Sequence, residues 1–378
     1  MGRPVRSRPV ATPLLHPGTC VPPLDRVREK GMAVTIVEAA PVVGGVDTHL
    51  DVHVAAALDC FGGLLGVEPF PATPAGYRAL LGWMGEFGPV VRVGVEGTGA
   101  YGAGLARFLR RSGVEVIEVD RANRQARRQH GKSDPADAIE AARAAHNGRA
   151  RGLAKTRDGN VEAIRALVVA KRSARNTRIK TINQIRQLTF TAPDELRERM
   201  RGLATVPLTL EAAGLRPRAG GDPVMYATKL ALQTLGRRVL SLGAEASRLD
   251  EVLGELVAET APSLLALFGV GVDTAATLLV AAGDNAERLR SEAAWAHLCG
   301  VAPVPASSGK VVRHRLNRGG NRQANTALWR IVMVRMLHDP ATQAYVERRT
   351  KEGRSKLEII RVLKRYVARE VYRHLPRG

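Results

Sequence analysis

Residues 42–137 show strand-like and helix-like runs in an order that few folds accommodate. Three apolar runs bounded by Gly or Asp, at 42–50, 52–59 and 64–70, predict a meander of three strands. Helical and strand patterns then alternate along the chain, around 77–83, 90–98, 102–111, 114–120 and from about Asp134. Alternating elements of this kind predict a mixed sheet whose faces are covered by helices.

The predicted order of elements, βββαβαβα, matches an α/β fold of the RNase H-like type. The chain has 378 residues, which is enough for two modest domains and a connecting element. We expect four parts: a disordered basic extension, the RNase H-like domain, a helical coiled-coil connector and a mainly α-helical C-terminal domain. Their expected ranges are 1–38, 39–155, 156–260 and 261–378.

Four carboxylates of the α/β domain lie at the ends of predicted strands or at the start of a predicted helix. Asp47 ends the first predicted strand and Glu96 ends the fourth, each after an apolar run that would otherwise exclude charge. Asp134 and Asp137 are three residues apart, on one face of a helix that Pro135 can start. Hard oxygen ligands suit Mg²⁺ or Mn²⁺, and two such ions roughly 4 Å apart can clamp the attacking and leaving oxygens of a phosphodiester. The pattern therefore predicts phosphoryl transfer at a metal site.

Each of these residues also has a structural alternative. Asp134 is well placed to be a helix N-cap, and Asp47 could simply end a strand. His49 and His53 lie within the first predicted hairpin, and we expect them to pack or to face solvent rather than to bind metal. The combination of two strand-end acids with a helix-start pair favours the metal site over these alternatives.

The charge of the chain indicates a polyanionic partner. Lys and Arg number 57 against 36 Asp and Glu, which gives a net charge of +21. Because these cations are spread along the chain rather than flanking one apolar span, nucleic acid is favoured over a membrane. Cys20, Cys60 and Cys299 have no CxxC or Cys/His spacing, so neither a zinc site nor a disulfide framework is indicated. We expect a cytoplasmic, nucleoid-associated protein.

A long basic helix is predicted after the first domain. Residues 161–188 contain no Pro or Gly, and acidic i,i+4 partners are nearly absent. The cations of this segment are Lys171, Arg172, Arg175, Arg178, Lys180 and Arg186. The segment predicts a face that follows phosphates, with an ordinary solvated helix as the alternative.

A second long helix is predicted after a break at 206–223, which is rich in Pro and Gly. Its apolar residues follow a heptad spacing, at Leu232, Leu235, Val239, Leu242, Ala246, Leu249, Leu253 and Leu256. Such spacing predicts a coiled coil, which could form with the basic helix or with another chain. Gly236, Gly243 and Gly254 imply a close or weakened seam.

The segment around Gly269-Val-Gly271 resembles a helix-hairpin-helix element. Its glycine turn would offer backbone N–H groups to a DNA phosphate, while a plain connection in the core is the alternative. Further on, Ser307 and Ser308 precede a run of cations formed by Lys310, Arg313, Arg315, Arg318 and Arg322. There is no P-loop frame here, and Ser-Ser-Gly alone is more often a flexible loop than a nucleophile site. The cations would nevertheless hold a scissile phosphate under attack by serine.

Several of these motifs occur together in one known family. They are Asp47-Thr-His, Val95-Glu-Gly-Thr-Gly-Ala-Tyr-Gly, Lys132-Ser-Asp-Pro-Ala-Asp-Ala, the Gly-Val-Gly hairpin, and Ser307-Ser-Gly-Lys with Arg318-Gly-Gly-Asn-Arg. As a set they resemble the DEDD insertion-sequence transposases, the IS110 family, over about residues 42–370. Members of this family join a RuvC-like domain to a serine-bearing transposase domain and are guided by a structured bridge RNA.

The resemblance implies roles for individual residues. Asp47, Glu96, Asp134 and Asp137 would bind Mg²⁺ or Mn²⁺. Ser307 would be the covalent nucleophile, with Ser308 as the register alternative because this loop is one glycine short of the family's Ser-Thr-Gly-Gly form. A phosphoserine intermediate, donor and target DNA, a guide RNA and a homo-oligomer, dimer or tetramer, are also implied.

Two other functions compete with this one. In a junction-resolving nuclease of the RNase H-like type, the four carboxylates would activate water and the serine loop would only grip phosphate. In a non-catalytic remnant, the basic helices would bind nucleic acid without chemistry. The full set of acids argues against the remnant, because a degenerate copy would be expected to have lost at least one.

Overall fold

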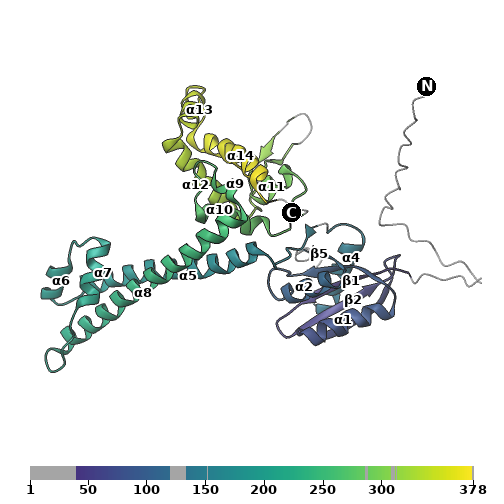
Figure 1. Ribbon diagram of the computed structural model, residues 1–378, viewed down its shortest axis with the longest axis horizontal. Coiled ribbons are helices and arrows are strands. Elements are labelled where there is room, and N and C mark those ends of the chain that lie inside the picture. The colour runs from purple at the N-terminus through teal and green to yellow at the C-terminus, as the bar shows by residue number, and fades with distance from the viewer. Residues whose placement is uncertain are drawn as a thin grey trace, which may run out of the picture. The chain divides into compact units, whose positions relative to one another are not determined.

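The computed structural model describes residues 40–119, 133–150, 152–285, 288–307, 311 and 313–376. The chain forms two compact units, Met1–Ala154 and Lys155–Gly378, which Figure 1 shows in purple to blue and in teal to yellow. The extension expected over residues 1–38 lies outside the described residues.

The first unit is built on a six-stranded sheet in the order β3-β2-β1-β4-β5-β6. Its strands are β1 Val42–Thr48, β2 Val52–Leu58, β3 Leu64–Pro71, β4 Val90–Glu96, β5 Glu115–Val119 and β6 Gly152–Leu153. Strands β1, β2 and β3 are antiparallel, whereas β1, β4 and β5 run parallel to one another. The predicted meander and the two later strands are therefore confirmed. The short β6, antiparallel to β5, was not predicted.

Helices cover both faces of this sheet, as predicted. They are α1 Pro74–Glu86, α2 Ala103–Arg111 and α4 Asp134–His146. Leu80 and Met84 of α1 share a buried core with Val46 and Val93 of the sheet, on the face that α2 also covers. On the opposite face, Ala138 and Ala142 of α4 pack against β2. Figure 1 shows α1 and α4 on opposite sides of the strands.

Two strand glycines let α4 lie directly on the sheet. A Cβ atom added to Gly45 of β1 would lie 2.0 Å from the backbone nitrogen of Ala142, and one added to Gly94 of β4 would lie 2.5 Å from the carbonyl oxygen of Ala141. No side chain fits in so small a space, because real Cβ contacts are far longer. The backbone of α4 is thus held against the two strands that carry Asp47 and Glu96 at their ends.

The second unit begins with two long helices that pack against each other. They are α5 Asn160–Phe190 and α8 Pro223–Thr260, joined through α6 Asp194–Met200 and α7 Thr205–Gly214. Ile164 shares a core with Leu253, and Ile185 shares another with Leu232, so the two helices run in opposite directions. This confirms the long helix predicted at 161–188. Figure 1 shows α8 alongside α5 within the chain. The heptad residues that lie in the two shared cores are Leu232, Leu235, Val239, Leu253 and Leu256.

The predicted break at 206–223 was too wide. Helix α7 occupies Thr205–Gly214, and its Pro207 lies in the first turn, where a missing N–H costs no helical hydrogen bond. Of the three seam glycines, Gly236 does allow a close approach, since a Cβ there would lie 2.4 Å from the backbone nitrogen of Ala213 in α7. A Cβ on Gly254 would meet no atom within 4 Å, so no close seam exists at that position.

The C-terminal part of the second unit is mainly helical, as predicted. Its helices are α9 Pro262–Leu265, α10 Val272–Ala282, α11 Glu292–Leu298, α12 Arg322–His338, α13 Pro340–Lys351 and α14 Lys356–His374. Two short strands, β7 Val304–Pro305 and β8 His314–Arg315, form a hairpin between α11 and α12. Trp295, Leu328 and Val367 share one core with Ile164 and Leu253, so the ends of α5 and α8 pack into this helical body. Among the described helices, none is both long and apolar enough to cross a membrane.

An ion pair between α11 and α14 gives the second unit a pH-dependent contribution to stability. Arg365 donates to Glu292, with Nη2 and Oε2 2.8 Å apart, and holds the pKa of Glu292 below its ordinary value, helped by the charges of Arg369 and Arg373. A lowered folded-state pKa adds stability that is present above the unfolded pKa and is lost as pH falls through the folded pKa. We expect Glu292→Gln to lower the free energy of unfolding at pH 7 by about 1 kcal/mol, as the pair is partly exposed.

Urea denaturation at a series of pH values between 7 and 3 checks this expectation. The difference between Glu292→Gln and wild type should shrink as the pH falls below the ordinary range of a glutamate. Glu255→Gln, an exposed glutamate of α8, is the control and should match wild type throughout. A difference that stays constant over the whole series would contradict the assigned role of the ion pair.

Candidate metal centre and nucleic-acid contacts

Asp47 and Glu96 lie side by side at the ends of two parallel strands. Val46 of β1 is in register with Val95 of β4, so the two acids occupy the next positions along. The hydroxyl of Thr48 donates to the carbonyl oxygen of Glu96 at 2.7 Å and ties these strand ends together. Both acids are buried, with exposed fractions of 7% and 9%.

Both strand-end acids are placed on the face of the sheet that α4 covers. Side chains two residues apart on a strand point to the same face. Gly45 and Gly94, two residues before Asp47 and Glu96, face the backbone of α4. The sheet therefore presents the two carboxylates toward the helix that carries the other two.

The first turn of α4 carries Asp134 and Asp137. Ser133 is the N-cap, and its side chain accepts from the backbone nitrogen of Ala136 at 3.4 Å. The alternative that Asp134 caps the helix is therefore wrong. Asp137 is 6% exposed and Asp134 is about half-exposed. The positive end of the helix dipole favours acids in this turn.

His49 lies between the sheet and α4. Its Nδ1 is 3.8 Å from Oδ2 of Asp47, and its Nε2 is 3.8 Å from Oδ1 of Asp134. Asp47, His49 and Asp134 each offer a ligand atom, and these atoms lie within 4.8 Å of one another. Glu96 and Asp137 are outside this group of three within the described part of the chain. The sequence interpretation favoured packing or solvent for His49, although its place two residues after Asp47 was a usable signal.

The donor set fits a divalent cation. Bonds of about 2.1 Å to Mg²⁺ place opposite ligands about 4.2 Å apart, close to the separations found here. Two carboxylates supply hard oxygen donors of the kind that suits Mg²⁺ and Mn²⁺, and an imidazole nitrogen is a ligand that suits other transition ions. The residues present are thus able to hold one ion among Asp47, His49 and Asp134.

His53, the other histidine of the first hairpin, packs in the core as expected. It is fully buried in β2 and stacks on Tyr77, with ring centroids 5.7 Å apart. Burial is the main cause that lowers the pKa of His53, which favours the neutral ring. It is therefore a packing residue in this structure.

Lys171 forms ion pairs within the protein and is not exposed in the way expected of a phosphate-binding residue. Its side chain, 12% exposed, makes ion pairs with Asp250 of α8 and Asp273 of α10. Burial alone would lower the pKa of Lys171, but the hydrogen bonds and charges of the two aspartates outweigh it and raise this pKa. Lys171 has no acid one turn away along α5, and its two acidic partners come from neighbouring helices.

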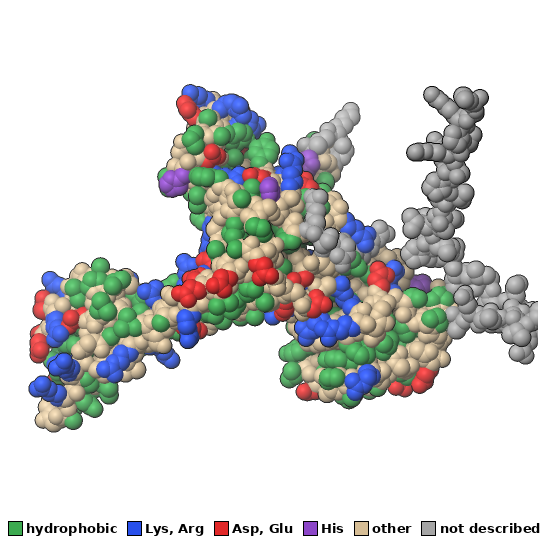
Figure 2. All heavy atoms as spheres, in the orientation of Figure 1, with side chains coloured by type: hydrophobic (Ala, Val, Ile, Leu, Met, Phe, Trp, Pro, Cys, Tyr) green, Lys and Arg blue, Asp and Glu red, His purple; other side chains and the backbone are tan. Residues whose placement is uncertain are grey.

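The other cations of α5 are more accessible. Arg172, Arg175, Lys180 and Arg186 are exposed, and Arg178 is partly buried. Arg172 donates to the side chain of Gln323 in α12 at 3.0 Å, and Arg186 donates to Thr205. Figure 2 shows Lys and Arg along the arm formed by α5 and α8, and also over α13.

The glycine turn that was predicted to approach a phosphate lies before α10. Gly269 has φ of +81°, a conformation that favours glycine, and Gly271 is the residue preceding the first turn of α10. A Cβ on Gly271 would meet no atom within 4 Å. The turn is therefore accessible beside Gly271. This fits both a turn that contacts a phosphate and a plain connection between helices.

The serine loop belongs to the β7–β8 hairpin. Ser307 is exposed, and its Oγ accepts from the backbone nitrogen of Arg313 at 3.1 Å and lies 3.3 Å from the carbonyl oxygen of the same residue. Ser308 and Lys310 lie outside the described residues. Arg313, Arg315, Arg318 and Arg322 are all exposed, on and after the hairpin.

Known proteins match both units of the chain. A family model described as a transposase matches residues 44–191, and a model of the transposase IS116/IS110/IS902 family matches residues 261–347. A protein of insertion element IS110 from Streptomyces coelicolor is 38% identical over 95 residues, 25% of this chain and 23% of that protein. A protein of insertion element IS900 from Mycobacterium paratuberculosis is 27% identical over 173 residues, 45% of this chain and 43% of that protein. The chain thus spans less than half the length of either relative.

Proposed function

Because this chain belongs to the IS116/IS110/IS902 family of transposases, we propose that it cleaves and joins DNA strands during transposition of an insertion element. The observation that carries this proposal is the meeting of Asp47, His49 and Asp134 at the end of the sheet, next to the buried Glu96 and Asp137. A cluster of acids at one end of the sheet, in a strongly basic protein, suits phosphodiester chemistry. The acids can hold metal while the cations hold the substrate.

We further propose that the first unit has an RNase H-like, RuvC-like fold. In support, three antiparallel strands are followed by two parallel strands in the order β3-β2-β1-β4-β5. In this proposal residues 39–155 form the catalytic domain, 156–260 the coiled-coil connector and 261–378 the C-terminal transposase domain.

Asp47, Glu96, Asp134 and Asp137 hold Mg²⁺ or Mn²⁺ in this proposal, and His49 joins Asp47 and Asp134 as a ligand. A cation held there would supply Lewis-acid stabilisation of the charge on the phosphate during strand cleavage. The protein contributes rigid placement, because two ligand strands are tied by Thr48 and the ligand helix is held on the sheet at Gly45.

Ser307 is the proposed nucleophile, with Ser308 as the register alternative. Its Oγ attacks the scissile phosphorus, a bond from phosphorus to a sugar oxygen breaks, and the proton of the hydroxyl passes to solvent or to the leaving oxygen. Arg313 and Arg315 lie in the same hairpin, and they would stabilise the charge of the phosphoryl oxygens. Rejoining reverses these steps with a different DNA hydroxyl.

The proposed partners are donor and target DNA and a structured guide RNA. If the RNA selects the target by base pairing, protein side chains are left to contact phosphates and shape, which agrees with the net charge of +21. The proposal includes a homo-oligomer, dimer or tetramer, that acts in the cytoplasm on the nucleoid.

The test combines purified full-length protein, Mg²⁺, RNA transcribed from the flanks of the element, and labelled donor and target duplexes. A protein–DNA adduct that resists denaturant is expected in wild type and lost in Ser307→Ala. Loss only in Ser308→Ala would move the nucleophile by one position. Arg349→Gln, in α13 and outside the hairpin, is the control and should still form the adduct.

Other results of this assay separate the competing functions. Metal-dependent cleavage that survives both serine substitutions without any adduct would replace the serine mechanism by a carboxylate and metal nuclease. Neither adduct nor cleavage under any metal, with DNA binding intact, would leave a non-catalytic binding protein.

A further inference from the structure

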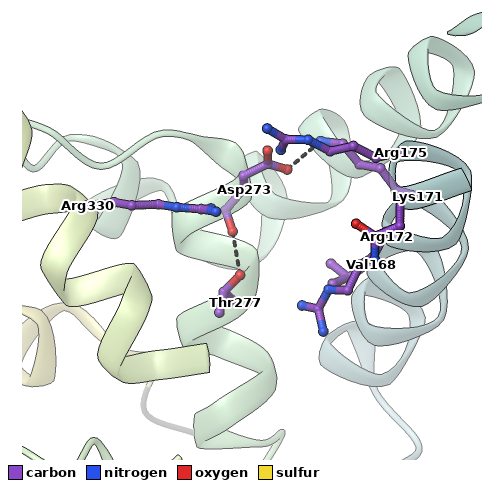
Figure 3. Close-up of a pocket in the computed structure, with 8 residues that line it drawn as sticks. Val168, Lys171, Arg172, Arg175, Asp273, Thr277 and Arg330 are labelled. Carbon is purple, nitrogen blue, oxygen red and sulfur yellow. Dashed lines mark hydrogen bonds and ion pairs between the residues drawn. The ribbon is translucent and has the colours of Figure 1, made fainter. Parts of the chain in front are cut away.

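A pocket of about 360 Å³ lies between α5, α10 and α12 in the second unit. Figure 3 shows side chains from these three helices projecting into it. Its lining residues are Val168, Lys171, Arg172, Arg175, Asn176, Asp273, Thr277 and Arg330. None of these eight residues has a role in the catalysis proposed above.

The pocket has an excess of positive charge. Arg172, Arg175 and Arg330 are exposed, and a guanidinium group stays charged at any ordinary pH. Asp273 is the acid that lines the pocket, and its carboxylate is already paired with Lys171. Three cations of the lining are therefore left to attract an anion.

The pocket also has a fixed shape. Lys171 joins Asp250 of α8 to Asp273 in the first turn of α10, so it links three helices. Arg172 is oriented by its hydrogen bond to Gln323, in the first turn of α12. Because these contacts order the walls before a ligand arrives, binding costs less conformational entropy.

The position of the pocket supplies a second, independent indication. Asp273 and Thr277 lie in the first two turns of α10, directly after the Gly269-Val270-Gly271 turn. The N-terminal end of a helix carries a partial positive charge that favours anions. Guanidinium groups and the first two turns of α10 thus border the same pocket.

We propose that this pocket binds a phosphodiester group of the nucleic-acid backbone. Arginine forks match phosphate oxygens, and Asn176 adds a neutral hydrogen-bond donor at the same place. The contact would fix position without reading sequence. The inference rests on the proposed function in that the chain acts on nucleic acid, but it requires no catalysis. The phosphodiester could come from duplex DNA or from RNA.

The test measures the dissociation constants of full-length protein for a labelled DNA duplex and for a labelled single-stranded RNA, in EDTA, over a range of salt concentrations. The variant combines Arg172→Gln, Arg175→Gln and Arg330→Gln. The control combines Arg237→Gln, Arg238→Gln and Arg248→Gln, which are exposed arginines of α8 and remove the same charge.

We expect the pocket variant to bind at least about tenfold more weakly than the control. The log–log salt slope should also become shallower, by about 0.9 for each phosphate of duplex DNA that the variant no longer neutralises and by about 0.7 for each phosphate of single-stranded RNA. The nucleic acid with the larger change is the source of the phosphodiester. Equal binding and equal slopes for the pocket variant and the control, with both nucleic acids, would overturn the proposal.

A chemical experiment on wild type avoids any dependence on variant folding. Phenylglyoxal modifies accessible arginines, and peptide mass analysis locates the products. Bound nucleic acid should protect Arg172, Arg175 and Arg330 more than Arg237, and uniform protection would count against the pocket. Because neither experiment needs strand cleavage, failure of the catalytic proposal would leave a positive binding result standing. Likewise, failure of the pocket would leave an adduct at Ser307 standing.

Discussion

Gly45→Ala is expected to destabilise the first unit by about 3 kcal/mol or more and to disrupt the metal centre. The new Cβ would lie 2.0 Å from the nitrogen of Ala142 and 2.4 Å from the carbonyl oxygen of Ala138. Both are backbone atoms of α4, which cannot rotate aside as a side chain can. Helix α4 must therefore move off the sheet, and it takes Asp134 and Asp137 away from Asp47.

Thermal unfolding and Mn²⁺ binding measure the two consequences. A loss of about 3 kcal/mol corresponds to a fall of roughly 10 °C or more in Tm for a domain of this size. Gly82→Ala in α1 is the control, since a Cβ there meets no atom within 4 Å. That change should stabilise the helix by about 0.5–1 kcal/mol. A Gly45→Ala protein with the Tm and Mn²⁺ affinity of wild type would show that α4 does not sit so close to β1.

The strands of the first unit could be predicted because each is an apolar run with clear ends. The same reasoning missed β6, since the two residues Gly152–Leu153 are too short to show any alternation. It also could not predict that α4 packs directly on Gly45 and Gly94. Within a strand, a glycine has the same local signature whatever lies above it, and the contact with α4 depends on the register between β1 and β4.

The helical unit shows a similar limit. The heptad of α8 predicted a buried stripe, and the partner that covers it is α5 of the same chain. Charge balance was harder to predict. Lys171 had no acid within reach along α5, yet Asp250 and Asp273 approach it from two helices much further along the chain. Local spacing carries no signal for such pairs, because they form only once the helices have packed.

At the candidate site, residue type and position relative to a strand end carried most of the prediction. Asp47 and Glu96 were found because a carboxylate directly after a buried apolar run has a desolvation cost that needs a reason. His49 was not predicted as a ligand, because a histidine in a hairpin can pack or face solvent without binding metal. Ser133 rather than Asp134 caps α4, a choice between neighbours that the sequence alone leaves open.

Removing one buried carboxylate at a time should abolish strand cleavage without unfolding the protein. Asp47→Asn, Glu96→Gln and Asp137→Asn keep the shape of each side chain and delete one charge. If these acids hold the metal, each change should cost about 4 kcal/mol or more of transition-state stabilisation, or a rate loss of about 10³-fold or more. His49→Ala should weaken Mn²⁺ binding by a smaller factor, since two carboxylates of its group remain.

Cleavage of labelled donor DNA gives the rate, and titration with Mn²⁺ gives the affinity on the same preparations. Glu86→Gln is the matched control, because Glu86 is an exposed acid at the end of α1, on the opposite face of the sheet from α4. It should retain wild-type cleavage and Mn²⁺ affinity. If an Asp47→Asn protein with wild-type Tm still cleaves at the wild-type rate, the carboxylates at the ends of β1 and β4 are not the catalytic centre. Cleavage lost with Mn²⁺ affinity unchanged would instead give these acids a role in placing DNA, because metal binding and chemistry would then depend on different residues.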